Sequence, residues 1–527
     1  MPWSAMKKFA GPFLVVAALA LLYQLAWNGD VWNQSLEKLT SMASLVEDNY
    51  YQDVDAQKMA FASIRGMLLT LDPHSYFLDP DNFSRLREDQ VGLYSGIGIQ
   101  IQKQEDRLVV ISPLEGTPAY RLGLQAGDVI SHINGESTKP ITSFEAMQKL
   151  RGEKGTKVRI TVVREGLDKP FDLTIVREEI PLYSVPYAFM LDNGVGYVFI
   201  RNFSETTPKE LEEKLKLLSG QGLKSLILDL RFNGGGPLFP SVEVADEFLP
   251  PGALIVSMRG RDKNYNREFR AVRGSQYEKL PMIVLINQGS ASASEIVAGA
   301  IMDNDRGSIV GEDSFGKGVV QTVFPFPADR IAVALTVAKY YTPSGRSIQR
   351  DYSNLEDYLM IKEKAPEQRE VRYTLKGRKV LGQGGITPDY EVKTTNKPLT
   401  LELFAKGSFF GYARKFAVHQ TPLSQTFVFP GEAPTSSGVL LTKNIKVEGR
   451  VLEDFKIYLQ TNKISYAAAG FPEASSEIKR ELEREITSAL WGPDEGQRVY
   501  RLSDPVVLKA LAVMPEAAKL IADRKGP

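Results

Sequence analysis

The stretch that decides the fold is Met282-Ile-Val-Leu-Ile-Asn-Gln-Gly-Ser-Ala-Ser-Ala-Ser-Glu295. It predicts an apolar strand that runs through a turn of small residues into a helix containing Ile296, Val297 and Ala300. A serine at such a strand-to-helix elbow exposes its hydroxyl, and the free N–H groups of the helix N-terminus can stabilise an oxyanion. The same serines also suit a simple N-cap cluster, because Ser is favoured at helix starts.

Strand and helix patterns alternate on the N-terminal side of this stretch, beyond Pro181. Nearly continuous apolar strands imply a sheet that is covered on both faces. The sequence therefore predicts an α/β core, with strands at 196–201, 223–230, 253–258 and 282–286 and helices at 208–218 and 238–248.

A second stretch, Gly311-Glu-Asp-Ser-Phe-Gly-Lys-Gly-Val-Val-Gln321, follows the elbow. A lysine between glycines and before Val319 and Val320 can be desolvated, which lowers its pKa until the neutral amine serves as a base. A lysine flanked by glycines also occurs commonly in simple turns. The interpretation of Lys317 as a base therefore depends on the nearby serine, which needs one. The Ser-x-x-Lys pattern formed by Ser314 and Lys317 is interpreted as chance, since no companion Lys-Thr-Gly is present.

A third stretch, Leu226-Ile-Leu-Asp-Leu-Arg-Phe-Asn-Gly-Gly-Gly236, is an apolar strand that ends in glycines. Glycine lets the backbone approach a ligand closely, so this loop could supply one N–H group to an oxyanion hole and Ala293 another. A tight turn between strand and helix remains the alternative interpretation. A phosphate-binding loop fits poorly, because no Lys-Ser or Lys-Thr follows the glycines.

Short strands separated by Gly-rich turns fill residues 91–177 and predict a small β-rich module. One helix interrupts them, and Thr142 with Glu145 three residues later forms its capping box. Arg151, just after this helix, is either a link between the module and the core or a solvated side chain.

The two ends of the chain differ in pattern. Lys7 and Lys8 precede an apolar run at 9–27, which predicts an export signal or, because it is long enough to span a bilayer, an uncleaved anchor. Helical spacing predicts a small helical region at 31–71, and amphipathic helices in the tail at 478–490 and 506–521.

The composition excludes several function classes. Lys+Arg 64 against Asp+Glu 64 leaves no net charge to attract nucleic acid, and the absence of cysteine excludes thiol catalysis and thiolate metal sites. A basic run at 259–273 is interpreted as a loop or hairpin at the rim of the active site. No His-Glu-x-x-His motif is present, so no metal or other cofactor is expected.

Taken together, these motifs resemble the carboxyl-terminal processing (tail-specific) protease family. The resemblance runs from about residue 35 to 393 and rests on five spaced motifs in order: 72–78, 228–236, 289–296, 315–321 and 384–389. It implies a multidomain α/β protein, with a ClpP/crotonase-like catalytic core, an inserted PDZ domain and helical N- and C-terminal regions. The expected domain ranges are a signal anchor or signal peptide at 1–27, a helical region at 28–90, the PDZ domain at 91–178, the peptidase core at 179–393 and a helical domain at 394–527.

The resemblance also implies roles for single residues. The nucleophile would be Ser292, the general base Lys317, and Gln321 would orient the amine. The oxyanion donors would be Ala293 and Gly235 or Gly236, because Asn-Gly-Gly-Gly here replaces the common Asn-Pro-Gly-Gly. The neighbouring serines 290 and 294 compete as nucleophiles, but the family gives them at most a structural role.

The β-rich module resembles a PDZ domain, in which backbone N–H groups of a loop capture a peptide's terminal carboxylate. Leu124-Gln-Ala-Gly-Asp-Val-Ile130 and Ile133-Asn-Gly135 fit the same pattern. The expected peptide-binding residues are those of the carboxylate loop and of the capped helix: Gly96, Ile97, Gly98, Ile99, Phe144 and Met147.

We therefore expect an extracytoplasmic serine endopeptidase on the periplasmic side, anchored to the inner membrane by residues 9–27. Its partners would be proteins or peptides with free C-termini, and it could form a homo-oligomer through its tail. Two rivals remain, a PDZ scaffold on an inactive core and an enzyme of acyl-CoA chemistry, since glycine-lined oxyanion holes serve that chemistry too.

Overall fold

The computed structural model describes residues 31–328, 330–360, 368–429, 439–441, 443 and 446–522. By its internal contacts the chain divides into two compact units, Met1–Pro80 with Val323–Leu335, and Asp81–Thr322 with Thr336–Pro527. The expected anchor at 9–27 lies outside the described residues. Within them, no helix combines the length and the apolar character that crossing a membrane requires.

The first unit is mainly helical, as the apolar spacing predicts. Residues 31–49 form a helix, and α2 (Ala56–Leu69) follows, capped by the side chain of Asp55, which accepts from Lys58 N. Strand β1 (Tyr76–Leu78) pairs antiparallel with residues 332–334 of the long strand β18 (Ile331–Tyr341).

The β-rich module opens the second unit and follows helix α3 (Pro80–Val91). Its antiparallel sheet has the order β3-β4-β5-β7-β8, with β6 beside β5, and β2 pairs with β9. The capping box of Thr142 and Glu145 is present at the start of α5, which confirms that prediction. The elements are β2 (Leu93–Gly96), β3 (Ile99–Gln104), β4 (Arg107–Pro113), α4 (Pro118–Arg121), β5 (Val129–Ile133), β6 (Glu136–Ser137), α5 (Ser143–Leu150), β7 (Lys157–Val163), β8 (Phe171–Val176) and β9 (Glu178–Pro181).

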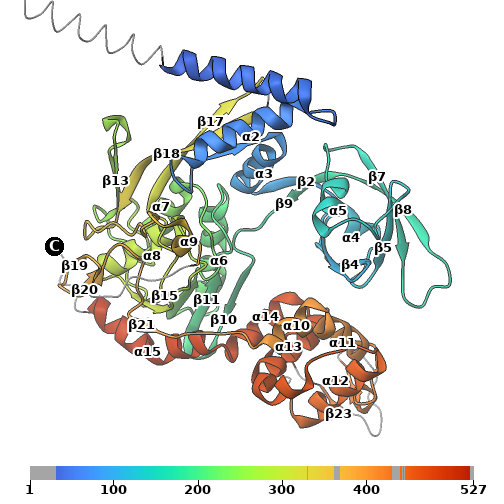
Figure 1. Cartoon of the computed structure of the whole chain (residues 1–527). Coiled ribbons are helices and arrows are strands. Elements are labelled where there is room, and N and C mark those ends of the chain that lie inside the picture. The colour runs from blue at the N-terminus through green and yellow to red at the C-terminus, as the bar shows by residue number, and fades with distance from the viewer. Residues whose placement is uncertain are drawn as a thin grey trace, which may run out of the picture. The chain divides into compact units, whose positions relative to one another are not determined.

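A six-stranded sheet forms the α/β core, with the order β10-β11-β12-β15-β16-β21 (Figure 1). All neighbours are parallel except β10 and β11, which are antiparallel. The elements of the core are β10 (Tyr187–Met190), β11 (Val195–Phe199), α6 (Thr207–Gly220), β12 (Ser225–Asp229), α7 (Leu238–Asp246), β15 (Met282–Ile286), α8 (Ala293–Asp303), β16 (Ser308–Gly311) and β21 (Tyr390–Glu391).

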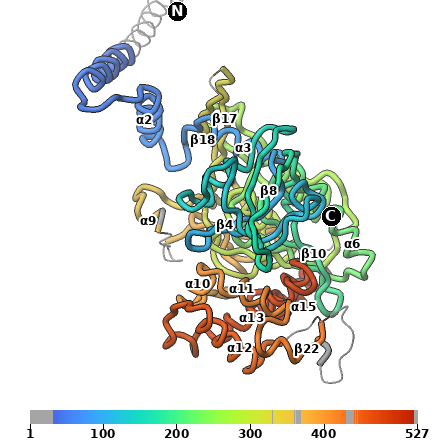
Figure 2. The backbone as a smooth tube through the Cα atoms, turned by 90° about the vertical axis from the view of Figure 1, so that its right-hand side faces the viewer, coloured from blue at the N-terminus to red at the C-terminus, as the bar shows by residue number. Residues whose placement is uncertain are grey.

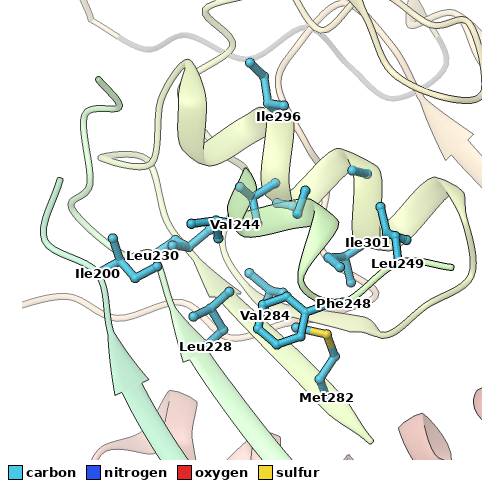
Figure 3. Close-up of a cluster of buried hydrophobic side chains, with 14 of the residues drawn as sticks. Ile200, Leu228, Leu230, Val244, Phe248, Leu249, Met282, Val284, Ile296 and Ile301 are labelled. Carbon is cyan, nitrogen blue, oxygen red and sulfur yellow. The ribbon is translucent and has the colours of Figure 1, made fainter. Parts of the chain in front are cut away.

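Helices α6, α7 and α8 bury one face of this sheet. Figure 3 shows Leu228, Met282 and Val284 of the strands packed with Phe248 and, from α8, Ile301. Burial of these apolar side chains fixes the helices on the strands, and so the loops at the carboxyl ends of β12 and β15 meet at one edge.

The predicted strand at 253–258 does not join the core sheet. It forms β13 (Leu254–Gly260), which pairs with β14 (Arg267–Arg270) and with residues 338–341 of β18, all antiparallel. The basic run at 259–273 is thus largely a hairpin, with η2 (Lys263–Tyr265) in its bend. Further elements of this region are β17 (Val319–Phe326), α9 (Leu355–Leu359), β19 (Val371–Tyr373) and β20 (Lys379–Leu381).

The tail divides between two hydrophobic cores. Helices α10 (Pro398–Ala405), α11 (Ser408–Ala417), α12 (Gly449–Thr461) and α13 (Phe471–Trp491) gather around a core of their own (Figure 2). After α14 (Pro493–Leu502), the last helix α15 (Pro505–Ala522) packs its Val507, Ala510 and Val513 on the second face of the core sheet, against Ile227 and Leu285. The end of the tail is therefore part of the architecture of the α/β core.

Candidate active site

Ser292 lies at the elbow between β15 and α8, as the sequence predicts. Its backbone has φ 57 and ψ −112, a left-handed conformation that is strained for a residue with a side chain. Such a turn projects the side chain away from both the strand and the helix.

The three serines of this elbow have different partners. Ser290 Oγ donates to the carbonyl of Leu230 at 2.8 Å and Ser294 Oγ to that of Asn233 at 2.8 Å, and both side chains are fully buried. Ser292 is half-buried, and its Oγ lies 3.0 Å from the hydroxyl of Tyr340. Only Ser292 therefore has a hydroxyl that is not committed to a backbone carbonyl.

Tyr340, on β18, is a site residue that the motifs did not indicate. It is buried, and burial raises the pKa of its phenol, partly offset by the hydrogen bond with Ser292. The phenol therefore stays neutral at physiological pH. No local pattern marks this tyrosine, because it stands 48 residues from Ser292 in an apolar strand.

Lys317 lies in the loop between β16 and β17, and its Nζ donates to Gln321 Oε1 at 2.5 Å. Both flanking glycines are packed against backbone: a Cβ at Gly318 would lie 2.7 Å from Gln349 N, and one at Gly316 3.1 Å from Gly385 N. Between the described side chains of Ser292 and Lys317 there is no direct hydrogen bond. The structure thus brings Lys317 and Gln321 together, whereas Ser292 is engaged with Tyr340.

Glu295 joins the loop between β15 and α8 (residues 287–292, the serine loop) to the loop between β16 and β17 (residues 312–318, the lysine loop). Its Oε2 accepts from the backbone N–H of Ser292 at 2.8 Å and of Lys317 at 2.9 Å, and its Oε1 accepts from Gly316 N at 2.7 Å and from Ser314 Oγ at 2.5 Å. Burial raises the pKa of Glu295, although these hydrogen bonds oppose the shift.

No sequence motif indicated a role for Glu295 in the site. The capping-box spacing from Ser292 to Glu295 was a usable signal for its bond to the serine backbone. Ser314 Oγ donates to Glu295 Oε1, and the interpretation of its Ser-x-x-Lys pattern as chance stays a prediction.

The glycine loop at 231–236, which we call the oxyanion loop, passes directly beside Ser292. A Cβ at Gly235 would lie 2.9 Å from Ser292 Cβ and 2.9 Å from the carbonyl of Ala291, and one at Gly236 would lie 2.1 Å from the carbonyl of Phe203. Both positions also have positive φ, 102 and 150, so only glycine fits there.

The N–H groups near Ser292 are not equally available. Gly235 N donates to the side chain of Asn233 at 2.9 Å, so this predicted donor is engaged in the structure. Ala293 N, at the first position of α8, has no acceptor among the described residues.

Asn233 is a further residue that the sequence analysis did not single out. Its carbonyl accepts from Ala291 N at 3.0 Å as well as from Ser294 Oγ, and its Nδ2 donates to the carbonyl of Ile200 at 2.9 Å. Because Asn233 is fully buried, these bonds tie the oxyanion loop to the serine loop.

The predicted carboxylate loop of the PDZ module joins β2 to β3. Within the described residues, the N–H groups of Ile97 and Gly98 have no acceptor, while the carbonyl of Ile97 accepts from Ala119 N at 3.0 Å. The Ile97 side chain lies in the module's core. The loop thus presents backbone donors rather than side chains.

The helix residues expected in the peptide groove have different surroundings. Phe144 on α5 is exposed, and the guanidinium of Arg85 lies 4.6 Å from the centre of its ring, whereas Met147 is half-buried. Arg151 is not simply solvated: it donates to Glu88 at 2.6 Å and stacks on Tyr94.

In the part of the chain that the structure describes, no three His, Asp or Glu side chains form a group that could hold a metal ion. The arrangement of Ser292, Lys317 and the backbone donors is suited to acyl transfer by a serine nucleophile.

Comparison with protein families gives two matches. Residues 194–356 match the model of peptidase family S41, and residues 95–175 match that of the PDZ domain. The first range contains the serine and lysine loops, and the second covers most of the β-rich module.

Two curated relatives of this chain are named carboxy-terminal processing proteases. The chain is 40% identical over 345 residues to the carboxy-terminal-processing protease of Bartonella bacilliformis, covering 64% of this chain and 79% of the relative. It is 35% identical over 344 residues to the carboxy-terminal processing protease CtpA of Bacillus subtilis, covering 64% and 73%.

Among solved structures, the photosystem II D1 C-terminal processing protease is 28% identical, with a TM-score of 0.36 and coverage of 68% of this chain and 88% of that one. The PDZ domain of a carboxy-terminal protease from Vibrio cholerae, solved in complex with peptide, is 33% identical, with a TM-score of 0.16 and coverage of 17% and 99%.

Proposed function

Since the chain belongs to the carboxy-terminal-processing proteases of peptidase family S41 and is a serine peptidase, we propose that Ser292 is its nucleophile and Lys317 its general base. The observation that carries this proposal is the contrast among the elbow serines. Ser290 and Ser294 are buried and bonded to backbone carbonyls, whereas Ser292 stands on a strained elbow with its hydroxyl on a tyrosine.

In the proposed mechanism, the neutral amine of Lys317 takes the proton of Ser292 Oγ as this oxygen attacks the scissile carbonyl. The tetrahedral intermediate collapses when the ammonium protonates the leaving amine, and an acyl-enzyme on Ser292 remains. Water, activated by the same amine, then attacks the ester, releases the new carboxylate and returns the proton to Ser292. Gln321, which accepts from Lys317 Nζ, would hold the amine in position for this proton transfer.

Where Ser292 is the donor in its hydrogen bond with Tyr340, its hydroxyl must exchange this partner for Lys317 before the reaction. Glu295, which accepts from the backbone N–H groups of Ser292 and Lys317 on one carboxylate oxygen, would keep the two residues close to each other for this exchange. Loss of one neutral hydrogen bond costs about 1 kcal/mol, which substrate binding can offset.

The oxyanion would be stabilised by Ala293 N–H, which has no other acceptor among the described residues. The second donor comes from the oxyanion loop. Gly235 N–H would supply it by leaving the side chain of Asn233, and Gly236 N–H is the alternative donor.

For substrate selection, we infer that the PDZ module captures the free C-terminus of the substrate. The N–H groups of Ile97 and Gly98 would bind the terminal carboxylate, and the peptide would add as a strand beside Ile99. Phe144 and Met147 would contact the terminal side chains, with Arg85 beside the ring of Phe144.

The same proposal places the peptidase outside the cytoplasm, with residues 9–27 as its membrane anchor. Its motivation is the pattern of two lysines and an apolar run near the N-terminus. Cell fractionation with mass determination of the mature N-terminus tests it, and a mature chain beginning near Leu21 would contradict an anchor. Light scattering of the purified protein tests the expected homo-oligomer.

The decisive experiment uses an unfolded reporter protein with a free apolar C-terminus and the same reporter with an amidated C-terminus. We expect the full-length chain to cleave the first reporter faster, and Ser292→Ala and Lys317→Ala each to abolish cleavage of both. Lys339→Ala, which removes an exposed lysine on β18, is the matched control and should leave cleavage unchanged.

Each other outcome contradicts a separate part of the proposal. Binding without cleavage by the unaltered chain would identify a PDZ scaffold. Turnover that survives Ser292→Ala would exclude a nucleophilic role for this serine, and equal cleavage of both reporters would exclude capture of the terminal carboxylate.

A further inference from the structure

A buried ion cluster joins the oxyanion loop to the tail. Arg231, the first residue of this loop, donates to Asp229 through Nε at 3.0 Å and Nη2 at 2.6 Å. It also donates to both oxygens of Asp504, through Nη1 at 3.1 Å and Nη2 at 2.8 Å. The contact spans 273 residues of sequence, and Asp504 lies outside the range that the peptidase family model matches.

Asp504 is held in place by its own surroundings. One of its oxygens accepts from Val506 N at 2.9 Å at the start of α15, and the other accepts from Arg501 Nη1 at 2.9 Å. Because α15 packs on the core sheet through Val507, Ala510 and Val513, the carboxylate of Asp504 has a fixed position at the start of that helix.

The charges of the cluster balance. Asp229 and Asp504 face Arg231 and Arg501, and all of these side chains are largely or fully buried. Tyr197 adds a hydrogen bond from its hydroxyl to Asp229 at 2.6 Å. Loss of the Asp504 carboxylate would leave one buried positive charge in the cluster uncompensated, and Arg231 would lose two of the hydrogen bonds that hold it.

Movement of Arg231 would displace the residues of the oxyanion loop that contact Ser292 and its neighbours. Two residues further on, Asn233 receives hydrogen bonds from Ala291 N and Ser294 Oγ on either side of Ser292, and Gly235 lies against Ser292 itself. The oxyanion loop is thus fixed at one end by the tail and in its middle by the serine loop.

We propose that Asp504 is a positioning residue of the peptidase, which holds the oxyanion loop through Arg231 so that its N–H donors face the transition state. The last tail helix then belongs to the catalytic machinery rather than serving only assembly. This inference rests on the proposed role of Ser292, and the Ser292→Ala result tests that role separately.

The test compares Asp504→Asn with Asp454→Asn in the full-length chain. Asp454 is the matched control, because it is also a buried tail carboxylate: it accepts from Tyr412 at 2.8 Å and lies in the separate core of α10–α13. We expect Asp504→Asn to lower kcat about tenfold to a hundredfold with KM nearly unchanged, since small misplacements of donors have effects of this size. Asp454→Asn should leave kcat unchanged.

A peptide boronic acid, which forms a tetrahedral adduct with a nucleophilic serine, gives a second measurement. Its affinity should fall in Asp504→Asn in proportion to kcat, while the affinity of a product peptide stays the same. A purely structural role would not separate these two affinities. If Asp504→Asn does not fold, Asp504→Glu replaces it, because this variant keeps the charge balance but displaces the carboxylate. A folded variant at 504 with normal kcat and normal boronic acid affinity would overturn the proposal.

Discussion

Two buried carboxylates, Glu295 and Asp504, support the loops that meet at Ser292, and their partners differ in charge. Glu295 accepts only from neutral groups, the N–H groups of Ser292, Gly316 and Lys317 and the hydroxyl of Ser314. Asp504 accepts mainly from two guanidinium groups. Accordingly, burial raises the pKa of Glu295, whereas Arg231 and Arg501 overcome burial and lower the pKa of Asp504 to about 2.

The difference shows that a buried carboxylate can hold the loop of the proposed base, Lys317, through its backbone N–H group rather than through its amine. Glu295 lies on the lysine side of the site, yet it binds the backbone of Lys317 while Gln321 binds the amine. A carboxylate on the amine itself would hold its proton and weaken the base. The oxyanion loop carries no base, so the ion pair of Asp504 with Arg231 can hold this loop without affecting a proton transfer.

The largest effect should come from Glu295→Gln. The amide replaces an acceptor by a donor in front of backbone N–H groups, and each buried N–H left unsatisfied costs about 1–3 kcal/mol. We expect kcat/KM to fall at least about a hundredfold, measured with the free C-terminal reporter.

Glu312→Gln is the matched control for that substitution. Glu312 precedes the lysine loop but accepts from Thr394 N at 2.7 Å, away from Ser292 and Lys317. Equal activities of the two variants would mean that Glu295 does not hold the catalytic loops.

Next comes the steric test of the oxyanion loop, Gly235→Ala. The new methyl group would lie 2.9 Å from Ser292 Cβ at a φ of 102, so the loop must move. A loss of kcat of at least about tenfold is expected. Gly234→Ala, where a Cβ has nothing within 4 Å, should retain activity. Similar losses in both variants would contradict the assigned packing of Gly235.

A smaller effect is expected on the free energy of unfolding at low pH, to which the carboxylate of Asp504 contributes. Because its pKa is depressed, its stabilising contribution is present above the unfolded pKa, near 3.8, and is lost as the pH falls toward about 2. Urea unfolding should show that the difference in unfolding free energy between the unaltered chain and Asp504→Asn shrinks by about 2 kcal/mol from pH 4 to pH 2. Parallel pH profiles would show that Asp504 is not held by charge.

The smallest effect is expected from Tyr340→Phe. Without the phenol, Ser292 no longer gives up a hydrogen bond when it turns to Lys317, and the lost bond is worth about 0.5–1.5 kcal/mol. The acylation rate, measured in single-turnover experiments, should rise about two- to tenfold. A fall in that rate would instead place the Tyr340 hydroxyl among the groups that assist catalysis.

The sequence predicted those parts of the site that are encoded locally. The elbow at Ser292, the contact of Lys317 with Gln321 and the capped helix α5 each depend on residues within about four positions of one another. Family membership and the mixed fold with a PDZ domain were also predicted correctly.

The remaining features depend on long-range packing. Tyr340 reaches Ser292 across 48 residues, and Asp504 reaches Arg231 across 273. The strand at 253–258 has the same apolar pattern as the strands of the core sheet, yet it pairs with β18. The pattern indicates which residues are buried, but it does not indicate which strand is the partner. The sequence pattern identified the tail as helical. It did not show that α15 packs on the core sheet while α10–α13 form a core of their own, because that depends on contacts between distant segments.

The most direct test of the account is the intact mass of the protein after reaction with a fluorophosphonate, followed by mapping of the modified residue. A mechanism with Ser292 as nucleophile and Lys317 as base predicts one adduct, on Ser292, that forms at least about a hundredfold more slowly in Lys317→Ala and is absent in Ser292→Ala. An adduct on Ser290 or Ser294, or labelling as fast in Lys317→Ala as in the unaltered chain, would contradict it.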